Sequence, residues 1–337
     1  MRYATERETG GVLEPTEVID GTLVIDVLKS KHPTTRLPQL DALKEYPELP
    51  EFIDLNLTED IVQKVAKQMR GGAGLGGVDG TFLRNLLINY GDHSRRLRQV
   101  VATFCSWMAN SSPPWAAYRA FRGGRLIALD KQPGIRPIGI GEIWSRLFAK
   151  VVLVDAGEGT KQACGIDQLC AGLEAGIEGG IHAISELVKQ HEMEEDWGFL
   201  LVDARNAFNE LSRYTMLWTI RHEWPSGARF VFNCYTHLPT LDSRGPNGFF
   251  DLVHSKEGVT QGDPLAMFAY GVGILPLIRL LKSHHPQVTQ PWYADDAGAG
   301  GKFENIKAMF KELKEKTPKE HHSRHSRKSP ISPAIFC

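Results

Sequence analysis

This 337-residue sequence has few cysteines, no signal peptide and no long apolar run, and each absence limits the classes of protein to which it can belong. Its five cysteines include no Cys-x-x-Cys pair, so neither a structural zinc site nor a disulfide framework is indicated, and a reducing compartment is expected. No signal peptide opens the sequence. The longest apolar run, Met267 to Ile278, is too short to cross a bilayer and predicts a buried helix kinked or broken at Pro276. An intracellular protein, nuclear or cytoplasmic, without a transmembrane segment is expected.

Net charge is also nearly absent, at −1, but this value hides an asymmetry along the chain. Residues 61–160 carry 14 basic and 6 acidic residues, whereas residues 161–301 carry 10 basic and 17 acidic residues. The basic stretch favours contact with phosphates, although such a stretch is most often a solvated face. At 42% hydrophobic and 23% charged residues, the chain is typical of a globular protein with two or more lobes.

Two adjacent carboxylates stand out in the acidic stretch, within Tyr293-Ala294-Asp295-Asp296. Paired carboxylates repel each other unless a positive charge lies between them, and Mg²⁺ takes one or two protein carboxylates readily. Alone, the tetrapeptide is equally consistent with a solvated acidic turn. A third carboxylate, Asp203, ends the apolar run Gly198 to Val202, which predicts a buried strand that delivers it at its carboxyl end. An ordinary Asp that caps the next helix is the alternative.

A loop between these carboxylates runs from Gly258 to Leu265. Asp263 suits a helix N-cap and Pro264 the first helical position, so a helix is predicted to begin here. Gly262 permits close backbone approach to a ligand. A plain junction between loop and helix explains Asp263 and Pro264, but it explains neither Gln261 nor the order of the three segments.

Together these segments resemble a reverse transcriptase, an RNA-directed DNA polymerase. The strand with Asp203 and Phe208 is similar to polymerase motif A, residues 258–265 to motif B, and residues 293–296 to motif C. Residues 125–140 resemble the fingers segment that holds the incoming triphosphate. Residues 168–172 and 179–183 resemble a segment of non-LTR (LINE-like) retrotransposon enzymes. The resemblance covers roughly residues 60 to 316.

The resemblance implies a role for each residue. Asp203 and Asp295 would hold two Mg²⁺ ions, or Mn²⁺ in their place, with Asp296 in support. Phe208 would exclude a ribose 2′-hydroxyl, although it also fits a core aromatic of an amphipathic helix. The other expected site residues are Lys131 and Arg136 on the β- and γ-phosphates, Gln261 and Gly262 near the nucleotide, and Tyr293 and Ala294 as motif support. Lys131 and Arg136 are otherwise two surface charges on a hairpin. The implied partners are an RNA template, a DNA primer and a dNTP.

The expected fold is α+β, a right-hand polymerase with fingers and palm. Its palm would be a small antiparallel sheet backed by helices, with Asp203 and the Asp295-Asp296 turn on adjacent strands. Residues 1–57 are expected to be a polar, acidic and partly disordered extension, and residues 58–197 to form N-terminal helices and fingers, with a first helix that runs to about Arg70 and has Thr58 as its N-cap. Residues 198–316 would be the palm and residues 317–337 a basic disordered tail. A glycine-rich stretch, residues 71–80, lacks the Gly-Lys-Ser/Thr ending of a P-loop, so we expect a mobile loop near the template.

Three functions remain open from the residues. The first is a retroelement reverse transcriptase that transfers dNTPs to a primer 3′-hydroxyl. Because no thumb or primer-grip pattern follows residue 316, the sequence predicts a C-terminally truncated enzyme with weak, distributive activity. The second is a truncated retroelement remnant, weak or inactive, that at most binds nucleic acid. The third is a cellular RNA-binding scaffold, for which Asp203→Ala would leave function intact.

Overall fold

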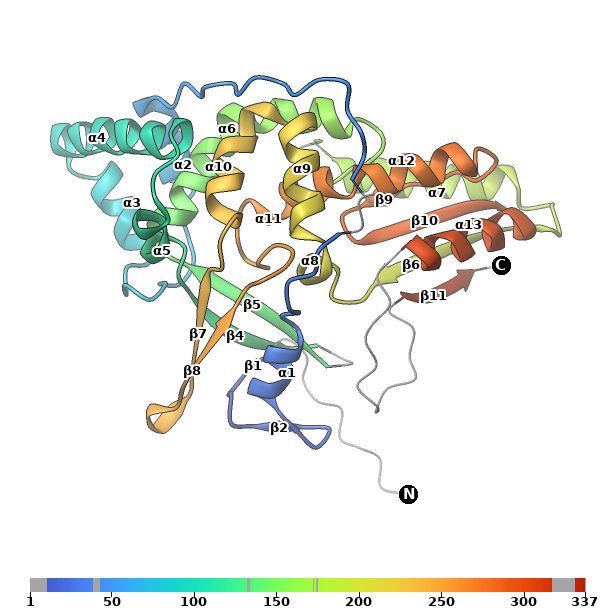
Figure 1. Ribbon diagram of the computed structural model, residues 1–337, viewed down its shortest axis with the longest axis horizontal. Helices are drawn as coiled ribbons and strands as arrows, with labels where there is room; N and C mark the ends of the chain where they lie inside the picture. Colours follow the sequence, from blue (N-terminus) through green and yellow to red (C-terminus); the bar gives the residue numbers. More distant parts are fainter. Residues whose placement is uncertain are drawn as a thin grey trace.

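The computed structural model describes residues 11–38, 43–131, 134–171, 173, 175–316 and 331–336 (Figure 1). These residues form a mixed α/β fold with a four-stranded sheet, a five-stranded sheet, a two-stranded ribbon and a cluster of helices. In Figure 1 the four-stranded sheet lies to the right, the five-stranded sheet lies at the lower left, and most helices lie above it.

The four-stranded sheet is antiparallel, in the order β11-β6-β10-β9. Its strands are β6 (Trp197–Ala204), β9 (Trp292–Tyr293), β10 (Asp296–Lys302) and β11 (Ile331–Phe336). One face is apolar and packs on α12 (Leu275–His284) and α13 (Phe303–Lys316), burying Leu200, Val202, Ala297 and Ala299. With the helices after β6 as the first crossover and α13 as the second, the chain order follows the β-α-β-β-α-β pattern of ferredoxin-like sheets.

Strand β11 corrects the prediction of a disordered tail without an apolar strand. It pairs with β6 over its whole length, with Ile331 opposite Ala204 and Phe336 opposite Phe199. Pro333 interrupts its apolar pattern, but a proline is tolerated on an edge strand, and β11 is at the edge of the sheet. The rest of the predicted tail, 317–330 and 337, lies outside the described residues.

The five-stranded sheet is built on a hairpin of β4 (Gly124–Asp130) and β5 (Ile135–Gly141). The other edge of β4 pairs with β7 (Thr240–Arg244) at one end and with β1 (Val12–Leu13) at the other. β8 (Phe250–His254) extends the sheet beyond β7, and η2 (Pro246–Gly248) lies in the connection between the two.

The sheet also buries part of the segment expected to be partly disordered. The ribbon β2 (Val18–Ile19) and β3 (Thr22–Leu23) leads into α1 (Val24–Ser30), whose Val24, Ile25 and Leu28 enter the same core as Leu126 and Leu241. These elements are too short to show a periodicity in the sequence, and their stability comes from tertiary packing. Residues 1–10 and 39–42 lie outside the described residues.

The helical cluster contains the largest hydrophobic core. As predicted, a helix begins after Thr58, whose hydroxyl accepts a hydrogen bond from the Ile61 N–H at 3.4 Å. The helices of the cluster are α2 (Glu59–Lys67), α3 (Gly80–Ile88), α4 (Gly91–Asn110), α5 (Trp115–Phe121), α6 (Ile143–Cys164), α8 (Ala207–Glu210), α9 (Arg213–Glu223), α10 (Pro225–Tyr235) and α11 (Ala266–Gly273). A further helix, α7 (Gly176–Gln190), lies beside the four-stranded sheet.

The long apolar run is divided as predicted. Helix α11 ends at Gly273, and Pro276 lies in the first turn of α12, where its missing N–H costs nothing. Among the described residues, one helical stretch, Ala266–His284, is apolar and long enough to cross a membrane by composition alone. Half of that stretch is buried within the fold, as in the core helix of a soluble protein, so it is weak evidence for a membrane span.

The glycine-rich stretch lies against the start of α6. The Gly76 N–H donates to the Glu142 carboxylate at 2.7 Å, and a Cβ on Gly74 would lie 2.8 Å from the Glu142 Cα. Glycine at residue 74 therefore permits a close approach between two segments of this chain.

Candidate functional site

The acidic turn, Tyr293 to Asp296, is a two-residue hairpin between β9 and β10. Tyr293 pairs with Asp296, which leaves Ala294 and Asp295 as the connection. Ala294 has a φ of 52°, the positive value that both favoured two-residue turns require at their first central position. Glycine usually takes this position, so Ala294 is in a costly conformation that its surroundings must hold. The turn places Asp295 at the tip and Asp296 at the start of β10.

Asp203 lies directly opposite Asp296 in the ladder between β6 and β10. The strands are neighbours, as expected, and opposed residues of an antiparallel pair direct their side chains to the same face. Leu200 and Val202 bury their side chains against the helices α12 and α13, whereas Leu201 and Asp203 are exposed. The two carboxylates therefore lie on the face of the sheet opposite these helices. Three carboxylates therefore meet on the open face of the sheet.

Burial and mutual repulsion act on these carboxylates together. Burial is the largest cause of the raised pKa of Asp295, and the charges of Asp296 and Asp203 raise it further. The pKa of Asp296 is raised by burial and by Asp203. Lys131 opposes both shifts but forms no ion pair with them. Within the described part of the chain, no basic group forms an ion pair with any of the three, so each stays exposed to the repulsion of the others.

The donor chemistry of this set suits a hard cation such as Mg²⁺, which prefers oxygen ligands and neutralises repelling carboxylates. In the described residues, however, no three side chains of His, Cys, Asp or Glu are arranged to hold a metal ion as they stand. The backbone register already places Asp203 beside Asp296. Other side-chain rotamers are needed to bring their carboxylate oxygens around one ion.

Two glycines of β10 lie on the same face farther from the turn, where Phe199 and α7 cover it. A Cβ on Gly298 would lie 2.5 Å from the Phe199 ring, and one on Gly300 would lie 2.7 Å from Leu187 of α7. These positions therefore admit side chains of β6 and α7, and this packing explains the glycine-rich sequence of β10.

Lys131 and Arg136 lie on the hairpin of β4 and β5, which we call the basic hairpin. Arg136 pairs with Leu129, and Lys131 follows Leu129 by two residues, so both cations lie on one face. Both are exposed, and the Lys131 N–H donates to the Gly134 carbonyl at 3.1 Å. Lys131 is near enough to affect the pKa values of Asp295 and Asp296, whereas Arg136 has no such effect. Gln132 and Pro133, between Lys131 and Gly134, lie outside the described residues.

Residues 258–265, which we call the glutamine loop, pack between the basic hairpin and α8. The Gln261 carbonyl accepts a hydrogen bond from the Gly139 N–H of β5 at 2.8 Å. Gly262 has a φ of 102°, and a Cβ there would lie 2.6 Å from the Gly139 oxygen. On the other side, the Val259 N–H donates to the Phe208 carbonyl at 2.7 Å. The loop thus joins the five-stranded sheet to α8, the helix that follows β6, through backbone contacts.

Phe208 stacks on Tyr270 of α11, with ring centroids 4.6 Å apart and planes 18° from parallel. The side chain of Phe208 is half-buried. It is therefore packed like a core aromatic, and part of its ring is still accessible to a ligand. Burial raises the pKa of Tyr270, and the charges of Asp295 and Asp296 raise it further, so its hydroxyl stays protonated. Sequence reasoning missed Tyr270. In the sequence it is one residue of an apolar helix, and only the tertiary structure shows that Phe208 stacks on it.

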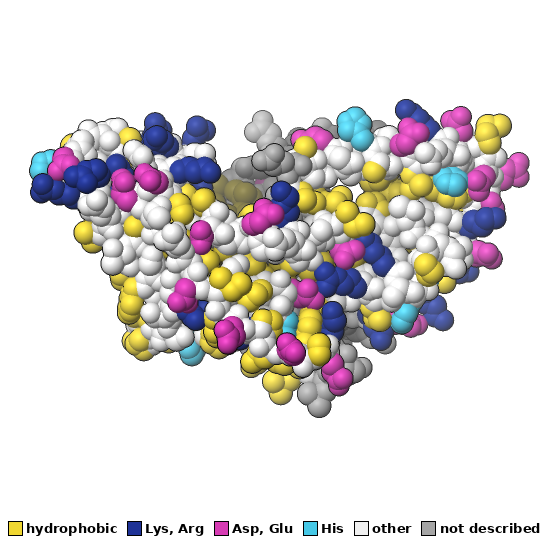
Figure 2. All heavy atoms as spheres, turned by 90° about the horizontal axis from the view of Figure 1, so that it is seen from above, with side chains coloured by type: hydrophobic (Ala, Val, Ile, Leu, Met, Phe, Trp, Pro, Cys, Tyr) yellow, Lys and Arg dark blue, Asp and Glu magenta, His cyan; other side chains and the backbone are white. Residues whose placement is uncertain are grey.

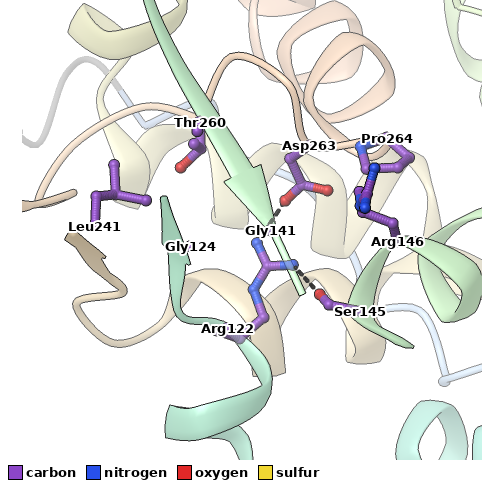
Figure 3. A pocket seen from close by; sticks show the side chains of 10 residues that line it. Arg122, Gly124, Gly141, Ser145, Arg146, Leu241, Thr260, Asp263 and Pro264 are labelled. Carbon is purple, nitrogen blue, oxygen red and sulfur yellow. Dashed lines mark hydrogen bonds and ion pairs between the residues drawn. The ribbon is translucent and has the colours of Figure 1, made fainter. Parts of the chain in front are cut away.

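A small pocket lies between the basic hairpin, the start of α6 and the glutamine loop (Figure 3). Inside it Arg122 forms a buried ion pair with Asp263 at 2.5 Å and donates to Ser145 at 3.0 Å. The Tyr235 hydroxyl donates to the same carboxylate oxygen at 2.6 Å, and Asp263 raises the pKa of Arg122 although burial opposes this shift. Its lining residues are Arg122, Gly124, Gly139, Gly141, Ser145, Arg146, Leu241, Thr260, Asp263 and Pro264.

The prediction that Asp263 caps the helix and that Pro264 is its first residue is wrong, because α11 begins at Ala266 with Leu265 as its N-cap residue. Asp263 instead lies in the turn before the helix, where its other carboxylate oxygen accepts from the Leu265 N–H at 3.0 Å. The sequence offers no signal for the partner Arg122, because 141 positions separate the two residues.

The basic stretch of the sequence reaches the surface at one end of the molecule. In the view from above, Lys and Arg side chains gather at the left end, where α4 lies (Figure 2). Part of this charge is neutralised locally, since Arg95 and Arg96 both pair with Asp92. The opposite end of the same view shows basic, acidic and histidine side chains mixed together.

No family model and no curated protein sequence matches this chain. Among solved structures, it is similar to telomerase from Candida albicans in complex with the TWJ fragment of telomeric RNA, at a TM-score of 0.46 and 10% identity over 71% of this chain and 47% of that one. It is also similar to apo telomerase from Candida tropicalis truncated from its C-terminal domain, at a TM-score of 0.41 and 10% identity over 76% and 62%. The chain thus spans about half to three fifths of these two structures.

Proposed function

We propose that this chain is an RNA-directed DNA polymerase, with the four-stranded sheet as its palm and the basic hairpin as part of its fingers. The observation that carries the proposal is the ladder register that sets Asp203 beside Asp296, at the start of the turn that holds Asp295, together with the two exposed cations Lys131 and Arg136 on one face of the basic hairpin. Carboxylates beside a separate cation are what nucleotidyl transfer needs, because the metal and the triphosphate must be held together.

Asp203 and Asp295 would hold Mg²⁺, or Mn²⁺ in its place, with Asp296 in support. Bound there, the metal would activate a primer 3′-hydroxyl and neutralise charge on the leaving pyrophosphate. The protein's own contribution is the register of β6 and β10, which keeps the carboxylates side by side before any ligand arrives. Repulsion between them favours cation binding, because a divalent ion relieves it.

Lys131 and Arg136 share one face of the basic hairpin and would bind the β- and γ-phosphates of a dNTP. Gln261 and Gly262 lie between that hairpin and Phe208, where the nucleotide would sit. The ring of Phe208, held by Tyr270, would crowd a ribose 2′-hydroxyl and so select deoxynucleotides. A DNA primer and an RNA template complete the proposed set of partners. A non-LTR retroelement origin is the finer part of the proposal and depends on the segment 168–183.

One observation favours a second candidate, a chain that binds nucleic acid without polymerising. The carboxylates are adjacent, yet within the described residues they are not gathered around a metal position. A remnant of a polymerase could keep this backbone register after losing catalysis.

Primer extension on an RNA template with Mg²⁺ and dNTPs separates the two candidates. The wild type should extend the primer and Asp295→Asn should not. A matched control is Asp196→Asn, since Asp196 lies just before β6, far along the sheet from the turn, and forms only an exposed ion pair with Lys302. Extension by all three proteins would refute the proposed metal site, and absence of extension by folded wild type would favour the second candidate.

A further inference from the structure

Gln168 forms two hydrogen bonds to a single residue of the acidic turn. Its side-chain Nε2 donates to the Ala294 carbonyl at 3.1 Å, and the Ala294 N–H donates to its Oε1 at 2.8 Å. The side chain is fully buried, and the two residues lie 126 positions apart in the sequence. Gln168 thus satisfies both backbone polar groups of Ala294.

Neighbouring contacts hold Gln168 in this place. The next residue, Leu169, donates its N–H to the Trp292 carbonyl at 2.9 Å, so the segment after α6 lies along β9. On the other side, Gly271 of α11 leaves room for Gln168, whose Cγ would lie 3.3 Å from a Cβ at residue 271. The amide is therefore enclosed between α11 and the turn.

The bonded residue is the one in the costly conformation. Ala294 has a positive φ, and a residue with a Cβ keeps such a conformation only when its surroundings hold it. An amide side chain offers one donor and one acceptor group, so it can bond both the N–H and the C=O of the same residue. Asp295 follows Ala294 directly, and its carboxylate position depends on the backbone of this turn.

A second buried glutamine, Gln290, provides a comparison for the hydrogen bonds of Gln168. Gln290 is also buried, but its Nε2 donates to the Leu281 carbonyl at 3.2 Å and its Oε1 has no partner within the described residues. Gln290 lies close to the same hairpin in sequence, yet it contacts no residue of the turn through a hydrogen bond. It serves as a matched control.

We infer that Gln168 is a positioning residue, which fixes the acidic turn so that Asp295 is ready to bind a divalent metal. The inference rests on the proposed function for its metal, and it adds a residue that contacts neither metal nor nucleotide. Partners that orient metal ligands typically change metal affinity or activity 10- to 100-fold when they are removed.

The test compares wild type, Gln168→Met and Gln290→Met, because Met is similar in length and forms no comparable hydrogen bonds. Three quantities are measured: the Kd for Mn²⁺ by electron paramagnetic resonance, kcat and KM for a dNTP in single-nucleotide extension, and hydrogen exchange of the peptide containing the turn. For Gln168→Met we expect an Mn²⁺ Kd about 10-fold higher, a kcat about 10- to 100-fold lower, little change in the dNTP KM, and faster exchange in the turn. Gln290→Met should leave all of these near wild type.

Wild-type Mn²⁺ affinity and kcat in folded Gln168→Met would overturn the inference, and so would equal losses in both variants. If Gln168→Met does not fold, Gln168→Asn keeps a buried amide but is one methylene too short to bond both backbone groups of Ala294, and an unchanged kcat in that variant would also overturn it. A wild type that neither binds Mn²⁺ nor extends a primer would instead refute the proposed function. In that case faster exchange in Gln168→Met would show that the hydrogen bonds hold the turn for another reason.

Discussion

The two larger sheets hold their charged residues in different ways. In the four-stranded sheet, Asp203 and Asp296 are opposed in a ladder, so backbone hydrogen bonds determine their separation. In the five-stranded sheet, Lys131 and Arg136 lie on an exposed hairpin and reach out on long side chains. The backbone positions on the acidic side are thus fixed by the ladder, whereas the long side chains on the basic side can adapt to a ligand.

Buried polar contacts link the five-stranded sheet to the helices. The glutamine loop bonds to β5 through the Gln261 carbonyl, and Asp263 of the same loop pairs with Arg122. This pair belongs to neither sheet and lies between the end of α5 and the start of α11, beside the five-stranded sheet. The comparison therefore predicts three kinds of effect. Changes to the carboxylates should lower the rate of extension, changes to the Arg122–Asp263 pair should lower the free energy of unfolding, and changes to Phe208 should alter nucleotide discrimination.

The largest effect is expected for Asp203→Asn, which breaks the acidic side alone. Extension should fall roughly 10³-fold, the size seen when charge stabilisation is removed from phosphoryl transfer. The variant should fold normally, because the substitution removes a charge that repels Asp295 and Asp296. Single-nucleotide extension and a thermal melt measure both quantities, and extension within threefold of wild type would contradict the prediction.

Arg122→Leu should cause the largest loss of stability. It leaves the Asp263 carboxylate buried without its cation, which typically costs about 3–5 kcal/mol. Urea unfolding measures the change, and Arg95→Leu is the control because Arg95 forms an exposed pair with Asp92. Adding Asp263→Asn to Arg122→Leu should recover part of the loss. A single variant as stable as the control would show that the buried pair does not stabilise the fold.

Phe208→Ala should reduce discrimination against ribonucleotides by about 10- to 100-fold, as expected when a pocket loses one large steric element. The ratio of kcat/KM for a dNTP and its matching rNTP measures the effect. Tyr270→Phe keeps the ring against which Phe208 stacks, so that variant should discriminate as wild type does. Unchanged discrimination in Phe208→Ala would assign the ring to core packing alone.

The smallest effect is a metal-dependent change of melting temperature. The pKa values of Asp295 and Asp296 are raised in the folded chain, so these groups favour folding at low pH, and that contribution is lost as pH rises from their ordinary pKa through the raised one. At neutral pH a divalent ion should restore stability, by about 1.4 kcal/mol at ten times its Kd. The melting temperature should rise by about 1 to 2 °C in wild type with Mg²⁺ and stay constant in Asp295→Asn. An equal rise in both proteins would place the ion elsewhere.

Local patterns in the sequence predicted several elements correctly. Thr58 caps α2, Pro276 divides α11 from α12, and the strand that ends near Asp203 lies beside the strand that begins at Asp296. Each follows from a short-range rule: capping, the missing N–H of proline, or an apolar run that needs burial. Strand β11 was missed because its six residues include a proline.

The residues that support the site could not be predicted in the same way. Arg122 and Gln168 each bond to a partner more than a hundred positions away, and nothing in the neighbouring residues indicates either contact. A buried polar group must be satisfied, but the sequence does not say which distant group will do so.

The sequence by itself determined which residues could carry the chemistry: three carboxylates, two cations and an aromatic ring, each placed by a local pattern. Only the tertiary structure decided how they meet. The ladder of β6 and β10 sets Asp203 beside Asp296, and Gln168 holds the costly turn that presents Asp295. The physical reason is that strand pairing and burial act between segments distant in sequence, so their outcome depends on the whole fold.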